Sequence, residues 1–218
     1  MVFILNLFVW AQASSTAIPF GTLVALVAMW LCISLPLVFT GSYYGFKKAP
    51  WDHPTRTTAI ARQIPRQPWF LRTVPSALIG GLSPFAVIFI ELLFVFKSLW
   101  QDKSGYYYMY GFLALIAGIN FITVMEMSIV MTYFMLCAEN YQWWWRSFLV
   151  GSSSAFWIFL YSVYYFLTKL QIEGFVSTLL FFAYSGLACV VYGLLMGTIG
   201  FFATYAFVRK IYGAIKAD

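Results

Sequence analysis

The sequence of 218 residues is 62% hydrophobic, 22% aromatic and only 9% charged, with a net charge of +6. Soluble domains contain about 45–50% apolar and about 25% charged residues, and a globule of this size has too little interior to bury such an excess. This composition excludes a soluble enzyme, and it excludes a disordered chain because too much apolar surface would be left in water. We therefore interpret the chain as a membrane protein whose surroundings are the lipid bilayer.

Long apolar runs predict transmembrane helices rather than a β-barrel. A spanning helix needs about 20 apolar residues, whereas barrel strands alternate in polarity over about ten residues. Five runs have the full length, and a sixth, at the N-terminus, has half of it. The predicted spans are about 20–43, 77–99, 109–137, 148–170 and 175–208, with a partial span at about 1–11. The predicted fold class is all-α, a polytopic transmembrane helical bundle forming a single transmembrane domain over residues 1–218.

The N-terminal run has two interpretations. Val2–Trp10 is an apolar stretch followed by Ala11-Gln12-Ala13, which is typical of a signal peptide and its cleavage site. However, no basic side chain precedes this stretch, as one would in a signal peptide. The alternative is the second half of a transmembrane helix whose first half is absent from the chain.

The connections between the spans predict the orientation. The long connection 44–76 holds five of the eight prolines, so we expect an extended loop rather than a helix. The side with this loop, the hairpin 138–147 and the tail 209–218 carries ten of the thirteen lysines and arginines. The positive-inside rule therefore places the loop and the C-terminus in the cytosol. Because the basic residues serve as this orientation signal, we expect no nucleic-acid partner.

Several motifs along the chain resemble one known family. They are Ile33–Leu37, Arg62–Gln67, Phe89–Leu92, Leu136–Tyr141 with Trp143–Arg146, Gly197–Phe201 and Phe207–Tyr212. Together they resemble the nonaspanins, the transmembrane 9 superfamily, from about Asn6 to the last residue. The resemblance implies about nine spans behind a large luminal domain, so this chain resembles the C-terminal portion of such a protein, and we expect it to begin within a truncated span. It is either a fragment or a complete short protein. The resemblance also implies a non-enzymatic role in localising other membrane proteins in the Golgi and endosomes.

The C-terminus is the strongest functional signal in the sequence. Lys216-Ala217-Asp218 places an ammonium group two residues before two carboxylates, a compact pattern that a coat protein can recognise through paired charges. In nonaspanins a terminal Lys-x-Asp is similar to a coatomer-binding signal. The resemblance therefore implies that Lys216 and Asp218 bind a coatomer-type coat. The alternative is an ordinary basic tail that stops membrane transfer.

The last span contains a G-x-x-x-G pair, Gly193 and Gly197, which allows two helix backbones to approach closely. One interpretation is packing within this chain. The other, which the resemblance favours, is the docking of glycine-rich helices from transmembrane cargo proteins.

Two carboxylic acids, Glu91 and Glu126, lie inside predicted spans. An ionised side chain at mid-membrane costs at least about 2.5–3.5 kcal/mol on insertion scales, so such residues are candidates for function. Asn120 and Thr123 lie at helical spacing from Glu126, which predicts a polar stripe facing the bundle interior. The stripe has two interpretations: hydrogen bonds between neutral groups of neighbouring helices, or a path through a proton-coupled transporter or channel subunit.

The cysteines and the histidine predict neither a metal site nor a disulfide. Cys32, Cys137 and Cys189 lie in or at the ends of spans, and His53 stands alone in the long loop. This spacing matches no set of metal ligands, so we expect no metal and no cofactor.

Overall fold

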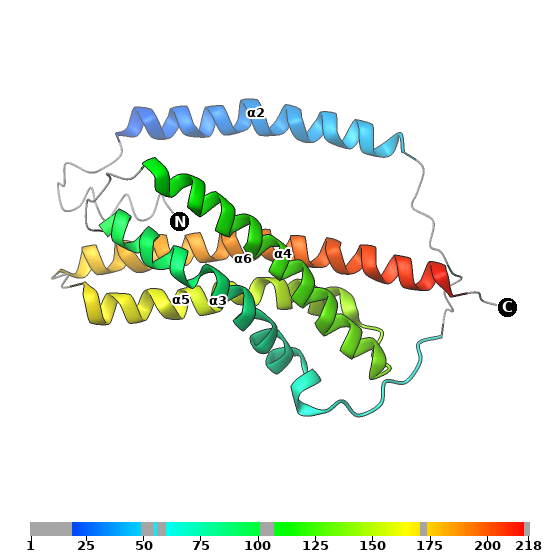
Figure 1. Cartoon of the computed structure of the whole chain (residues 1–218). Helices are drawn as coiled ribbons and strands as arrows, with labels where there is room; N and C mark the ends of the chain where they lie inside the picture. The colour runs from blue at the N-terminus through cyan, green and yellow to red at the C-terminus, as the bar shows by residue number, and fades with distance from the viewer. Residues whose placement is uncertain (1–18, 49–54, 56–59, 101–106, 171–173, 216–218) are drawn as a thin grey trace. The chain divides into compact units, whose positions relative to one another are not determined.

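The computed structural model describes residues 19–48, 55, 60–100, 107–170 and 174–215. Over these residues the chain forms five long helices, one short 3-10 turn and no strands (Figure 1). The elements are α2 (Phe20–Phe46), η1 (Trp69–Leu71), α3 (Thr73–Trp100), α4 (Tyr107–Cys137), α5 (Trp143–Lys169) and α6 (Phe175–Ala214). All five helices include a stretch long and apolar enough to cross a membrane. The predicted fold class, an all-α polytopic bundle, is confirmed, while the partial span at 1–11 lies outside the described residues.

The helices extend beyond the apolar runs that predicted them. Helix α5 begins at Trp143 rather than at residue 148, and α6 continues to Ala214 rather than ending at residue 208. The added residues are mainly aromatic, basic and small, and aromatic and basic side chains are favoured where a membrane meets water. Hydropathy therefore predicts the stretch of each helix that is suited to hydrocarbon, whereas the hydrogen-bonded helix continues beyond that stretch.

The chain divides into two compact parts, one formed by residues 1–53 with 173–180 and the other by residues 54–172 with 181–218. The first part contains α2, which has no buried side chain along its length. The second contains η1, α3, α4, α5 and most of α6. The prediction of a single domain over residues 1–218 stays a prediction, and the sites described below all lie in the second part.

Helix α5 holds α3 through very close backbone contact and through hydrogen bonds. A Cβ atom at Gly81 of α3 would lie 2.7 Å from the main-chain carbon of Ser153, so only glycine fits there. The Ser153 hydroxyl donates to the main-chain oxygen of Ala77 at 2.6 Å, and the Trp157 indole Nε1 donates to that of Leu78 at 3.1 Å. Side chains of one helix thus bind the backbone of the next, as is typical where lipid supplies no hydrophobic drive for association.

A separate apolar cluster joins α3, α5 and α6 in the C-terminal half of α5. Its buried members are Leu92 of α3, Ile158, Tyr161 and Tyr165 of α5, and Phe181 of α6. The rings of Phe89 and Tyr161 meet edge to face with centroids 5.2 Å apart, a favoured arrangement of aromatic pairs. The cluster and the glycine contact hold α3 against α5 at two levels.

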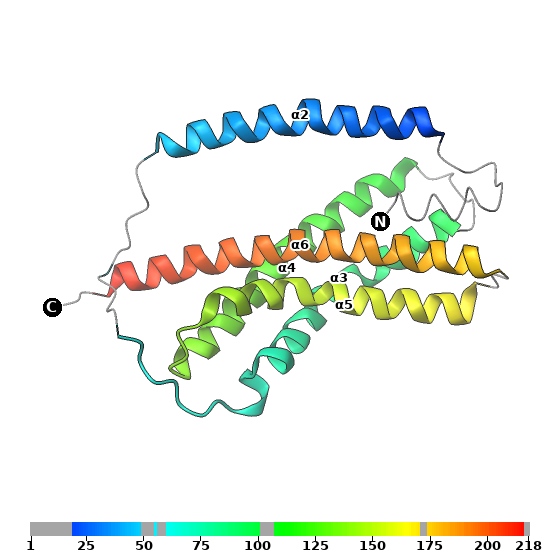
Figure 2. The ribbon, with the colours of Figure 1, turned by 180° about the vertical axis from the view of Figure 1, so that it is seen from behind.

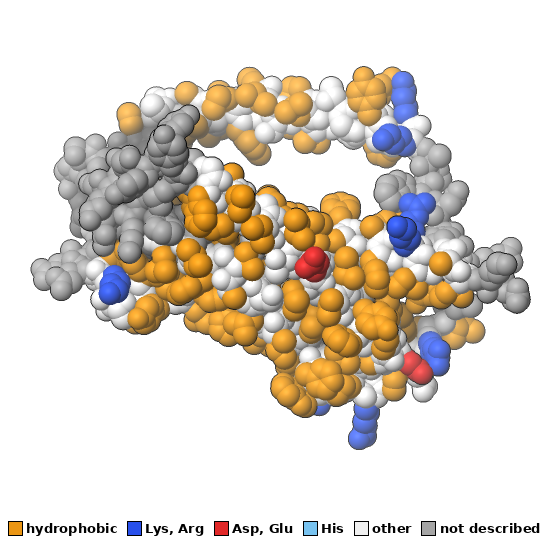
Figure 3. All heavy atoms as spheres, in the orientation of Figure 1, with side chains coloured by type: hydrophobic (Ala, Val, Ile, Leu, Met, Phe, Trp, Pro, Cys, Tyr) orange, Lys and Arg blue, Asp and Glu red, His pale blue; other side chains and the backbone are white. Residues whose placement is uncertain are grey.

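Four helix termini lie toward the same end of the bundle: the starts of α3 and α5 and the ends of α4 and α6 (Figures 1 and 2). The described basic residues of this end are Arg62, Arg66, Arg72, Arg146, Arg209 and Lys210. Lys169 lies at the opposite end of α5. Figure 3 shows hydrophobic side chains over most of the face between the two ends. We call the end with the arginines the basic end; its cytosolic location stays a prediction.

Candidate functional site

A seam of small residues joins α5 to α6. Gly193, Gly197 and Gly200 are all buried, and their spacing places them on one face of α6. A Cβ atom at Gly193 would lie 3.1 Å from the Cβ atom of Ala155, and one at Gly151 would lie 2.6 Å from the main-chain oxygen of Met196. The two backbones are therefore in direct contact along this seam.

The seam determines what the predicted G-x-x-x-G pair contacts. A Cβ atom at Gly197 would collide with the Ser152 hydroxyl and would lie 2.7 Å from the Phe148 ring, both of α5. Gly193 and Gly197 thus pack within this chain, as the first interpretation proposed. Docking of cargo helices at these two glycines stays a prediction, and it requires α5 to move away from α6.

A polar stripe does line the interior face of α4, but with a different period from the predicted one. Asn120, Ser128 and Thr132 are all at most 2% exposed, and they lie eight and four residues apart. The Asn120 amide nitrogen donates to the Tyr192 hydroxyl of α6 at 2.8 Å. The Asn120 amide oxygen and the hydroxyl oxygens of Ser128 and Thr204 are buried with no hydrogen-bond partner among the described residues. This interior is therefore polar and only partly hydrogen-bonded.

Glu126 does not belong to that stripe. Its side chain is exposed on the surface of α4, and the Thr123 hydroxyl donates to Ile119 of its own helix at 3.0 Å. Two residues turn a helix by about 200°, so Glu126 points about 160° away from Ser128, the middle residue of the buried stripe. Among the described residues Glu126 thus does not share the face of Asn120, and its predicted role stays a prediction. Glu91 lies in α3, and its side chain lies outside the described residues.

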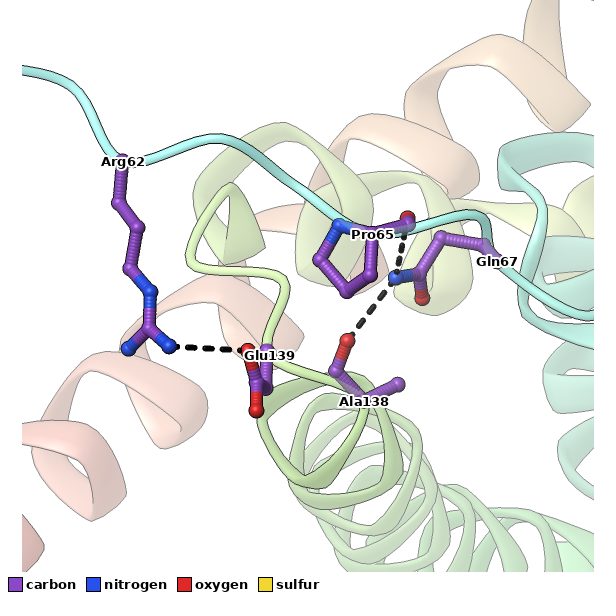
Figure 4. Close-up of polar contacts among 5 residues, drawn as sticks. All are labelled: Arg62, Pro65, Gln67, Ala138 and Glu139. Carbon is purple, nitrogen blue, oxygen red and sulfur yellow. Dashed lines mark hydrogen bonds and ion pairs between the residues drawn. The ribbon is translucent and has the colours of Figure 1, made fainter.

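The long loop is fastened to the end of α4 by two contacts (Figure 4). The Arg62 guanidinium lies 3.0 Å from the Glu139 carboxylate, and the Gln67 amide nitrogen donates to the main-chain oxygens of Ala138 at 2.9 Å and Pro65 at 3.1 Å. Arg62 and Glu139 are 76% and 58% exposed, so the ion pair contributes at most about 1 kcal/mol. Two of the motifs that carry the family resemblance therefore contact one another.

A cavity opens beside this fastening, at the basic end. It has a volume of about 550 Å³ and is lined by Arg66, Gln67, Arg72, Thr73 and Arg146. The sequence assigned these arginines only to membrane orientation. No local pattern signals the cavity, because Arg146 lies more than 70 positions from the other two arginines along the chain.

Helix α6 ends at Ala214, and the predicted coat signal, Lys216 and Asp218, lies outside the described residues. Cys32, Cys137 and Cys189 are free thiols. The described part of the chain contains no cluster of three His, Cys, Asp or Glu side chains that could hold a metal ion.

Comparison with known proteins decides the family. The family model described as Endomembrane protein 70 matches residues 1–175. The chain belongs to this endomembrane protein 70 family. Transmembrane 9 superfamily member 4 of Homo sapiens and member 9 of Arabidopsis thaliana are each 50% identical to it over 216 residues, or 99% of this chain and 33% of each relative. The chain thus spans about a third of the length of these relatives, and no solved structure matches it.

Membership confirms the resemblance to the nonaspanins, the transmembrane 9 superfamily. Together with the five long apolar helices, it identifies an integral membrane protein of this family.

Proposed function

We propose that this member of the endomembrane protein 70 family helps to localise other membrane proteins in the Golgi–endosomal system, with its own C-terminus in the cytosol. The observation that carries the proposal is the Lys216-Ala217-Asp218 sequence close after the end of α6, in a chain of this family. We assign no catalytic role to any residue.

The position of the tail supports recognition by a coat. Helix α6 reaches the basic end, where Arg209 and Lys210 are exposed in its last turns. An excess of lysine and arginine favours the cytosolic side, where coat proteins assemble. Asp218 lies four residues beyond Ala214, so it extends at most about 14 Å from the helix end. A coat that binds this signal must therefore approach to within about 14 Å of the end of α6.

Replacing both charged residues of the signal, Lys216→Ala with Asp218→Ala, tests the proposal in the chain tagged at its N-terminus. We expect the double variant to leave the Golgi and to lose binding to a coatomer-type coat in pull-down. Lys210→Ala is the matched control, because it removes a basic residue from the same region and leaves the signal intact. A double variant that stays in the Golgi and still binds the coat contradicts the proposal.

Transmembrane cargo with glycine-rich helices is the expected second partner, with Gly193 and Gly197 as the predicted docking residues. Since both glycines pack against α5, docking there requires the seam to open. Replacing both residues by leucine, Gly193→Leu with Gly197→Leu, removes the small face of α6, and we expect this double variant to lose cross-linking to cargo. Cargo cross-linking that survives the replacement contradicts docking at these glycines.

The alternative, a proton-coupled transporter that uses Glu91 and Glu126, predicts a different measurement. Glu126 is exposed on α4 instead of facing the bundle interior, so no observation favours this alternative. Proton-driven flux in liposomes that disappears in Glu126→Gln would support transport, whereas the sorting proposal predicts no flux.

A further inference from the structure

The cavity at the basic end is assembled from segments far apart in the sequence. Arg66 and Gln67 come from the long loop, Arg72 and Thr73 from the start of α3, and Arg146 from the first turn of α5. Its volume of about 550 Å³ lies within the range of about 300–1,000 Å³ typical of small-molecule sites. The loop is held in place by the Gln67 contact to Ala138, so the walls of the cavity are positioned without a ligand.

The charges of the cavity are suited to an anion with several negative charges. Three of its five lining residues are arginines, and none is acidic. Arg66 and Arg72 are exposed and form no ion pair among the described residues, while the neighbouring Glu139 carboxylate is already paired with Arg62. A guanidinium group offers a planar fork of N–H donors that matches the oxygens of a phosphate.

Arg146 is already oriented within this site. Its Nη1 atom donates to the main-chain oxygen of Leu71 at 2.8 Å, and Leu71 itself is buried. This bond uses one arm of the guanidinium and leaves N–H groups on the rest of it. A side chain held in this way loses less conformational entropy when a ligand binds.

Two exposed tryptophans indicate the depth of the cavity in a membrane. Trp69 precedes Arg72 by three residues and is 69% exposed, and Trp145 adjoins Arg146 and is 70% exposed. Tryptophan is enriched at the level of the lipid headgroups. In a bilayer, tryptophans at the headgroup level would bring the cavity within reach of a lipid headgroup, which favours a lipid over a soluble phosphate or a phosphorylated peptide.

We propose that this cavity binds the headgroup of a polyphosphoinositide. Three arginines in a cavity that no acidic residue lines suit a headgroup with several phosphate charges better than phosphatidylserine, which has a single net negative charge. The uncharged polar side chains of Gln67 and Thr73 are suited to the hydroxyl groups of the inositol ring. Basic pockets between transmembrane helices are a known setting for such headgroups.

The test uses the full 218-residue chain in phosphatidylcholine micelles, titrated with short-chain phosphatidylinositol bisphosphate. Arg66→Gln with Arg72→Gln removes two exposed arginines of the cavity. Lys47→Gln with Lys48→Gln, at the end of α2, is the matched control, because it changes the net charge equally and neither lysine is among the residues that line the cavity. We expect the arginine pair to weaken binding about 25-fold, or about fivefold for each charge, and the lysine pair less than about twofold.

Several results would overturn the proposal. Equal weakening by the two double variants would show diffuse attraction instead of a site. Equal affinity for short-chain phosphatidylserine, competition by inorganic phosphate at the concentration of the lipid, or tighter binding of a phosphorylated peptide would assign the cavity to another ligand.

A charge-conserving variant separates the geometry of the site from its charge. Arg66→Lys with Arg72→Lys keeps both charges and loses the planar forks, so we expect a loss of affinity between those of the wild type and the glutamine pair. The far-UV circular dichroism of each variant verifies that the helices are retained. Wild-type affinity in the lysine pair overturns recognition by the guanidinium groups.

Discussion

Replacing Gly151 of α5 by alanine introduces one methyl group into the seam with α6. Its Cβ atom would lie 2.6 Å from the main-chain oxygen of Met196 and 3.2 Å from the Cα atom of Gly197. Carbon–oxygen contacts between packed backbones lie at about 3.3–3.6 Å, so the helices must separate locally by about 0.7 Å or more. Both opposing atoms belong to the main chain, and no change of rotamer can relieve the collision.

The local separation of α5 and α6 destabilises the folded state. A gap of about 0.5–1 Å forfeits about a quarter to a half of the dispersion energy of each atom pair at the seam. Overpacking of a well-packed interior typically costs about 1–3 kcal/mol. We therefore expect Gly151→Ala to lower the free energy of unfolding by about 2 kcal/mol.

The assay is unfolding by sodium dodecyl sulfate in mixed micelles, with the helical signal of circular dichroism as the readout. Gly118→Ala in α4 is the control, because a Cβ atom there would meet no other atom within 4 Å. The free energy of unfolding of this control should equal that of the wild type or exceed it by up to about 1 kcal/mol, since alanine is a better helix former than glycine. If Gly151→Ala unfolds at the same detergent fraction as Gly118→Ala, the two helices do not touch at this point.

Three further predictions test other contacts. In a background without the native cysteines, Ala155→Cys with Gly193→Cys should form a disulfide on mild oxidation, because a Cβ atom at position 193 would lie 3.1 Å from that of Ala155 and needs only a small shift. The control pair, Ala155→Cys with Leu194→Cys, should form none. A disulfide in the control pair and none in the first pair, read from mobility on a gel, would refute the contact between α5 and α6. The free energy of unfolding of Glu139→Gly should exceed that of Glu139→Ala by about 1 kcal/mol, because both variants lose the ion pair and only glycine of the two adopts a φ of 57° without strain. Equal unfolding midpoints of the two variants would contradict this. Glu126→Leu should change the unfolding free energy by less than about 0.5 kcal/mol, since the side chain is exposed, and a loss above about 1 kcal/mol would place it in the interior.

The existence of the five long helices followed directly from the sequence. A segment in lipid must satisfy its backbone polar groups internally, so every full-length apolar run has one available structure. The same hydropathy could not place the helix ends at Trp143 or Ala214. Hydropathy measures the preference for hydrocarbon, whereas a helix continues wherever its own hydrogen bonds remain favourable.

The sequence identified the correct polar residue types within the spans but not all of their faces. Asn120 is buried as predicted, whereas Glu126 is exposed. Ser128 and Thr132, at spacings of eight and twelve residues from Asn120, share its face and were available as a signal. Small residues were equally ambiguous: Gly193 and Gly197 predicted a close helix contact, and only the packed bundle shows that α5 supplies it.

By itself, the sequence determined the fold class, the charge asymmetry between the two ends and the family resemblance. These properties depend on residues that are neighbours in the chain, since a helix forms hydrogen bonds only over four positions and a motif extends over a few more. Only the tertiary structure brought Arg66 and Arg72 beside Arg146, and Arg62 beside Glu139. Such contacts depend on how the helices pack, which is decided by the close approach of small residues and by interhelical hydrogen bonds distributed over the whole bundle.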